Sequence, residues 1–231
     1  MEIVNKIGLE AEFILKNEKD EIVYPGHYAF STDEFIILGE FRGEPGETRG
    51  ETIGNFFKEL IETRRKAKKD KLHLDFGYNE ITPEFKAKIL RKMGTKSIQS
   101  CLNLYGKDIL SMSDNIVKDG VIVKVKISTG LHIHFSKAVI HKWKDKDDNQ
   151  CSSSLKLLKE RDIKNIIKKM DTNILPNYDL GVKLKYRNPG FYEYKTWGFE
   201  YRSLPTCIKI LDFENLVKVV DYSFSLLEKL D

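Results

Sequence analysis

Four short segments of this chain share a pattern in which two polar residues, two positions apart, alternate with apolar residues. Side chains at i and i+2 point to the same face of a β-strand, so each segment predicts a strand with one apolar and one polar face. We expect the apolar faces to pack on helices and the polar faces to gather together. The four polar pairs are Glu10 and Glu12, Glu40 and Arg42, His132 and His134, and Glu200 and Arg202.

The rest of the chain mixes strand and helix patterns without a regular βαβ alternation. This mixture predicts the α+β class with a largely antiparallel sheet. The length of 231 residues predicts a single domain over 1–231. Expected strands cover 3–15, 21–24, 35–42, 72–76, 121–127, 130–135 and 199–204; expected helices cover 52–69, 83–93, 155–170 and 215–230; a charged loop covers 144–150.

Charge, hydropathy and cysteine usage restrict the class of protein. Lys and Arg number 39 against 35 Asp and Glu, and this net charge of +4 is too small to argue for nucleic-acid binding by itself. No apolar run approaches the ~18 residues of a membrane span, and the first residues resemble neither a signal nor a transit peptide. Cys101, Cys151 and Cys207 are isolated and indicate reduced thiols. We therefore expect a cytoplasmic protein without a membrane partner.

The eight paired residues supply four carboxylates, two imidazoles and two guanidinium groups. Taken singly, each pair fits an ordinary solvated strand face. Clustered carboxylates, however, repel one another and raise one another's pKa unless a cation compensates. Oxygen-rich sites suit Mg²⁺ or Mn²⁺, and arginines beside them indicate an anion such as phosphate. The residues alone therefore predict a metal-dependent phosphate enzyme, and neither a P-loop nor a protein-kinase signature is present.

Three of these segments resemble motifs of the glutamine synthetase and glutamate–cysteine ligase superfamily. GLEAEF at 8–13 resembles its opening Glu-x-Glu strand. GLHIH at 130–134 resembles the Gly-Met-His-x-His strand of glutamine synthetase, and EYR at 200–202 resembles a late Glu-x-Arg strand. WGFEYRSLP at 197–205 is similar to the ending of the small amidoligases of that superfamily, carboxylate–amine ligases found in phages and in some bacterial gene clusters.

The resemblance implies a largely antiparallel, curved sheet with helices on one face, like the catalytic domain of glutamine synthetase. It also implies an ATP-dependent ligase, in which a substrate carboxylate attacks the γ-phosphate and an amine then displaces phosphate from the acyl phosphate. ATP and two Mg²⁺ or Mn²⁺ ions would be its cofactors. The partners would be a small-molecule or peptide carboxylate and an amine, with nucleic acid only as a modified-base substrate, and the oligomeric state stays open. Abundant lysine and isoleucine suggest an AT-rich genome, such as that of a phage.

Site residues carry over from the resemblance position by position. Glu10 and Glu12 would serve different metals, Arg202 would face the transferring phosphoryl group, and Arg42 would hold the carboxylate substrate. Glu44 or Glu47 would supply a remaining ligand of the first metal. The implied metal ligands are Glu10, Glu12, Glu40, His132 and Glu200; the implied catalytic residues are Arg202, Arg42 and Arg187; the implied nucleotide-binding residues are His134, Lys195 and Arg202.

Other interpretations of the same residues stay open. A metal-dependent hydrolase would use His132, His134 and the acids around a metal-bound water. A non-catalytic binding module would instead use the lysine-rich helices on nucleic acid. Arg187 and Lys195 fit surface cations on an aromatic hairpin as well as a phosphate or substrate clamp. Glu193 stands where related amidoligases commonly have a basic residue, so the charge of the substrate would differ.

Overall fold

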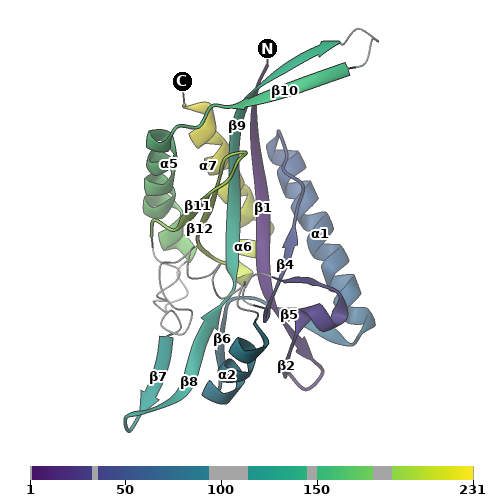
Figure 1. Ribbon diagram of the computed structural model, residues 1–231, viewed down its shortest axis with the longest axis vertical. Coiled ribbons are helices and arrows are strands. Elements are labelled where there is room, and N and C mark those ends of the chain that lie inside the picture. Colours follow the sequence, from purple (N-terminus) through teal and green to yellow (C-terminus); the bar gives the residue numbers. More distant parts are fainter. Residues whose placement is uncertain (1, 33–35, 94–113, 145–149, 179–188, 231) are drawn as a thin grey trace.

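The computed structural model describes residues 2–32, 36–93, 114–144, 150–178 and 189–230 (Figure 1). Within these residues the chain forms two antiparallel sheets and five α-helices, which confirms the α+β class and the antiparallel sheet. No helix in these ranges is long and apolar enough to cross a membrane.

Nine strands make the large sheet and three make a smaller one. The large sheet contains β1 (Glu2–Asn17), β2 (Ile22–Val23), β3 (Ser31–Thr32), β4 (Leu38–Arg42), β5 (Leu72–Asp75), β9 (Gly130–Lys144), β10 (Gln150–Lys156), β11 (Tyr192–Tyr194) and β12 (Phe199–Pro205). The small sheet contains β6 (Tyr78–Ile81), β7 (Asp114–Lys118) and β8 (Val121–Ser128). The helices are α1 (Arg49–Lys69), α2 (Pro83–Lys92), α5 (Glu160–Asn173), α6 (Ile208–Leu211) and α7 (Phe213–Glu228), with 3₁₀ turns η1 (Pro25–Tyr28) and η2 (Leu175–Tyr178).

The four polar pairs lie on four neighbouring strands, in the spatial order β12, β9, β1 and β4. On β1, Glu10 stands opposite His132 of β9 on one side and opposite Arg42 of β4 on the other. On β12, Glu200 stands opposite His134. Directly opposed residues in an antiparallel pair share a face, so the register brings the polar pairs together as expected.

The other face of these strands packs on helices α1, α5 and α7 (Figure 1). Leu9, Phe135 and Phe199 are fully or almost fully buried there, and the last two stack with ring centroids 4.8 Å apart. The helices contribute apolar side chains at helical spacing, such as Phe56 of α1 and Ile163 of α5. This confirms that the apolar parity of the strands faces the helices.

A second, smaller core lies beyond the polar pairs along β1. Ile14 has the same strand parity as the two glutamates of β1, yet it packs with Leu38, with Ile89 of α2 and with Ile127 of β8. One face of β1 therefore changes from polar to apolar within two residues. This change lets α2 and the small sheet pack against the end of β1 that follows Glu12 (Figure 1).

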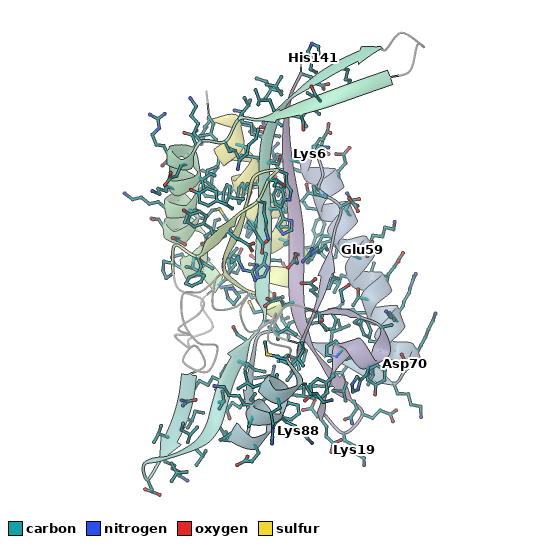
Figure 2. The ribbon with its side chains drawn as sticks, viewed as in Figure 1. Lys6, Lys19, Glu59, Asp70, Lys88 and His141 are labelled. Atoms are coloured by element: carbon teal, nitrogen blue, oxygen red, sulfur yellow. The ribbon has the colours of Figure 1, made fainter. Side chains whose placement is uncertain are left out.

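The predicted boundaries of three elements were wrong. The segment 150–156 forms strand β10, not loop or helix, because it pairs with β9, with Leu155 opposite Val139. Helix α5 consequently begins at Glu160, and β9 continues to Lys144 instead of ending at 135. His141, labelled in Figure 2, lies on this extension of β9.

The observed starts of two further elements differ from the expected ones. Helix α1 begins at Arg49, before the expected residue 52, because Thr48 caps it through a reciprocal pair of hydrogen bonds with Glu51. The strand expected over 35–42 begins at Leu38, and residues 33–35 lie outside the described residues. Most of the expected loop, 145–149, also lies outside them.

We expect Gly198→Ala to destabilise the protein by about 2 kcal/mol, the cost of overpacking a close contact. A Cβ at Gly198 would lie 1.9 Å from the carbonyl oxygen of Phe135, at the hairpin that joins β11 to β12. Urea unfolding measures the change. Gly54→Ala is the matched control, because Gly54 lies in α1 with nothing within 4 Å of the added Cβ. That variant should be neutral or stabilising, and equal effects at both glycines would contradict the prediction.

Candidate metal centre

A buried histidine is the centre of the polar cluster. The side chain of His132 is fully buried, and its Nδ1 lies 3.0 Å from Glu10 Oε1 and 3.0 Å from Glu200 Oε1. Its Nε2 lies 3.5 Å from Glu12 Oε1. The side chains of all three glutamates are at most 4% exposed. The strands β1 and β12, on either side of β9, thus direct three carboxylates at the imidazole of His132.

Backbone features set the orientation of these side chains. The backbone N–H of Gly130 donates a 2.5 Å hydrogen bond to Glu12 Oε2, which ties this carboxylate to the start of β9. Gly8 stands opposite His134 in the β1–β9 ladder, and a Cβ there would lie 3.3 Å from His134 Cβ. A glycine at this position therefore leaves room for the imidazole beside the cluster.

Cationic side chains surround the carboxylates. Arg202 Nη1 lies 2.6 Å from Glu200 Oε1, and Lys195 Nζ lies 3.2 Å from Glu200 Oε2. On the opposite side, the Arg42 guanidinium contacts Glu10, and its Nη2 lies 3.1 Å from Glu40 Oε1. The cluster thus combines buried acids with fixed positive charges, which is suited to binding an anion next to the acids.

The environment of His132 favours its charged form. Burial by itself would lower the pKa of His132, and the positive charge of Arg202 acts in the same direction. The negative charge of Glu12 and the hydrogen bonds to Glu10 and Glu200 outweigh both, and they raise this pKa to about 9.

The carboxylates shift in the opposite direction. Burial would raise the pKa of Glu10, but His132, His134 and Arg42 hold it well below its ordinary value. Burial would also raise the pKa of Glu200, and the contact with His132 keeps it low. Without a metal, the cluster therefore holds ionised carboxylates around a protonated imidazole.

The cluster fits a divalent metal ion. Glu10, His132 and Glu200 each offer one ligand atom, and these three atoms lie within 4.8 Å of one another. His134 Nε2 is also buried, at 3.5 Å from Glu10 Oε2 and 3.8 Å from Glu200 Oε2, and it forms no hydrogen bond with any described residue. Carboxylate oxygens suit Mg²⁺ or Mn²⁺, and the imidazole favours Mn²⁺.

No protein-family model, curated protein or solved structure matches this chain. The geometry of the cluster therefore carries the functional argument.

The structure brings together most of the residues that the sequence singled out. Glu12 stands opposite Glu40 across β1 and β4, beside the Glu10–His132–Glu200 triad. Arg187 lies outside the described residues. Of the two candidate loop ligands, Glu44 is exposed, and Glu47 pairs at 3.0 Å with Lys6, which is labelled in Figure 2.

Two further residues lie in the site, and the ion pairs of one of them, Glu193, were not predicted. Glu193 of β11 forms ion pairs through its Oε2, with Lys195 Nζ at 2.9 Å and with Arg202 Nη1 at 3.4 Å. It therefore belongs to the polar cluster. Trp197 packs against His134 with ring centroids 5.3 Å apart, and the residue is 40% exposed. An aromatic hairpin was expected here, but its register, which places Glu193 opposite Glu200, was not predicted.

We expect the metal-free protein to lose stability as the pH rises from about 6.5 to 9. The folded pKa of His132 is raised above its unfolded value, so its contribution is complete below pH 6.5 and disappears through pH 9. The shift corresponds to on the order of 3 kcal/mol. The lowered pKa values of Glu10 and Glu200 act oppositely, since their contribution is lost only as the pH falls below about 4.5.

Urea unfolding in the presence of a chelator, between pH 5 and 9, measures this dependence. His132→Gln should flatten the alkaline side of the profile because it removes the titrating group. An unchanged slope in that variant would show that another group causes the dependence.

Proposed function

We propose that this protein is an ATP-dependent carboxylate–amine ligase of the glutamine synthetase-like type. The observation that carries the proposal is the gathering of four separate sequence motifs, on β1, β4, β9 and β12, into one buried set of acids with cations beside it. Buried carboxylates with a metal-ligand spacing and adjacent arginines are the groups that phosphoryl transfer from a nucleotide requires. The overall reaction would convert ATP, a carboxylate and an amine into an amide, ADP and phosphate.

Two groups of residues would hold the divalent ions. Glu10, His132 and Glu200 would hold one ion, and the opposed carboxylates of Glu12 and Glu40 would contribute to a second. Bound there, the ions would neutralise phosphate oxygens and align them for in-line attack.

The cations of the cluster would stabilise the phosphoryl group during transfer. Arg202 is only 7% exposed and is held against Glu200, so its positive charge is fixed in a site of low dielectric. A fixed charge of this kind stabilises a transition state more than a mobile, solvated charge does, because neither the side chain nor the surrounding water has to rearrange during the reaction. Lys195, also paired with Glu200, would act on the same phosphate.

An aromatic rim lies next to these groups. Trp197 contacts His134, and Tyr192 and Tyr194 contact each other with ring centroids 5.1 Å apart on β11. Tyr194 and Trp197 are exposed, so their rings are accessible for stacking. We propose that the nucleotide base binds on this side, with its phosphates directed toward His134 and Lys195.

A metal-dependent hydrolase is the second candidate function. It would use the same triad, but it gives no reason for Arg42, Lys195 and Arg202 to surround the acids. The two functions differ in their requirement for a nucleotide, because hydrolysis by metal-bound water proceeds without ATP.

We expect Glu12→Gln and Glu200→Gln to abolish ADP release, at least about 1,000-fold, because each removes a charge that would bind metal. The assay contains ATP, Mg²⁺ or Mn²⁺ and pooled amino acids, peptides and amines. Release in the wild-type protein should require both a carboxylate and an amine. Glu160→Gln, on the exposed face of α5, should retain full activity. Product formation by the wild-type protein without ATP would instead indicate the hydrolase.

We expect Arg202→Ala to slow the same reaction by about 10²–10³-fold, the effect of removing one donor from a transition state. The loss should appear in kcat, with little change in KM for ATP, because Arg202 is proposed to act mainly on the transferring phosphoryl group. Steady-state kinetics separates the two parameters. An Arg202→Ala protein that folds normally, by circular dichroism, and keeps its kcat would remove Arg202 from the catalytic role.

A further inference from the structure

Arg42 neutralises two acids of the cluster although its own side chain is exposed. The guanidinium contacts Glu10 through Nε and Glu40 through Nη2, the latter at 3.1 Å. The Arg42 side chain is 61% exposed, whereas that of Glu10 is 3% and that of Glu40 is 11% exposed. An exposed partner leaves an ion pair at little cost, while the buried carboxylate depends on having a cation nearby. Arg42 is therefore the most easily exchanged of the positive groups that face Glu10, since His132 and His134 on the other side of this carboxylate are far less exposed.

A metal ion at the cluster would compete with this guanidinium. Glu10 belongs to the Glu10–His132–Glu200 triad that fits a divalent ion, and Arg42 contacts the same carboxylate. Two positive groups that contact one carboxylate repel each other, and the repulsion is strong at a buried site because the effective dielectric constant there is low. Binding of the ion therefore favours movement of Arg42 away from Glu10.

The space available to Arg42 is a groove between β4 and helix α1. The groove has a volume of about 870 Å³, and its walls include Glu40, Phe41 and Arg42 of β4. On the far side of β4, strand β3 reaches only residues 39 and 40, so no described strand covers Arg42 there. Arg42 thus lies between the polar cluster and the groove.

The opposite wall of the groove carries charges of both signs. Helix α1 contributes Glu59 and Glu62 and, one to two turns further, Arg65 and Lys69 (Glu59 is labelled in Figure 2). Among the described residues, these four side chains form no ion pair. A groove with unpaired acids and unpaired cations suits a ligand that has both an amino and a carboxylate group, more than it suits a polyanion.

We propose that this groove binds the carboxylate-bearing substrate, an amino acid or the end of a peptide. When a divalent ion occupies the cluster, Arg42 exchanges its contact with Glu10 for one with the carboxylate of this ligand. Metal binding and ligand binding are then coupled, and each strengthens the other. This inference rests on the metal site of the proposed function. It adds the location of the carboxylate substrate that Arg42 was expected to hold, and the order in which metal and substrate bind.

Mn²⁺ binding by itself tests the exchange. In Arg42→Gln no guanidinium competes for Glu10, so we expect Mn²⁺ to bind about tenfold more tightly than to the wild-type protein, within the range of couplings between linked sites. Electron paramagnetic resonance of free Mn²⁺, without nucleotide, measures the affinity. Arg49→Gln is the matched control, because Arg49 pairs with Asp221 and Glu228 on another part of the molecule and should leave the affinity unchanged.

Nitrogen-15 NMR of the arginine side chains tests the movement and the ligand. The Nε resonance of Arg42, assigned by its loss in Arg42→Gln, should shift on addition of Mg²⁺. With Mg²⁺ present, millimolar acetate or glycine should shift it again, whereas methylamine, which has no carboxylate, should not. Without Mg²⁺, none of the three should shift it.

The outcomes distinguish this inference from the function on which it rests. If the wild-type protein binds no Mn²⁺, both the metal site and the inference are overturned. If Mn²⁺ binds equally to the wild-type and Arg42→Gln proteins, or if acetate acts without Mg²⁺, only the inference is overturned and the metal site stands.

Discussion

The burial of several carboxylates around His132 is the constraint on which the rest of the site depends. A buried charge without a partner destabilises a protein by several kcal/mol, about 3–5 kcal/mol when one member of a buried pair is removed. Here the acids Glu10 and Glu200 meet His132, and cations contact them from both sides. The protein's own cations therefore neutralise these buried carboxylates before any ligand binds. A bound metal ion would take the place of one or more of these cations.

The cluster is built on strands, and this determines how accurately its groups are placed. Side chains on adjoining strands of a paired sheet are separated by the spacing of the ladder, which the backbone hydrogen bonds keep constant. The helices α1, α5 and α7 on the opposite face hold the sheet in place through a continuous apolar core. The more exposed members of the network, Arg42, Lys195 and Trp197, lie at its rim, where movement costs less.

Strand parity is a local property, and for this reason the sequence predicted which residues share the polar face. It did not predict which strands become neighbours, since the spatial order β12-β9-β1-β4 differs from the order along the chain. Glu193 was expected only to change the charge of the substrate, because its contact with Arg202 depends on how β11 pairs with β12. Leu155 was placed in a helix because its apolar spacing leads into α5, and its pairing with Val139 is a tertiary effect that overrides the local pattern.

The alternation along β1 also limits how this protein can vary. Glu10 and Glu12 belong to the charged cluster, and Ile14, on the same face, belongs to the second core with α2. An insertion or deletion of one residue before Ile14 would turn either the glutamates toward the helices or the isoleucine away from its core. The number of residues between the glutamates and Ile14 is therefore fixed by the two faces of the strand, and changes in length are tolerated only in the loops at its ends.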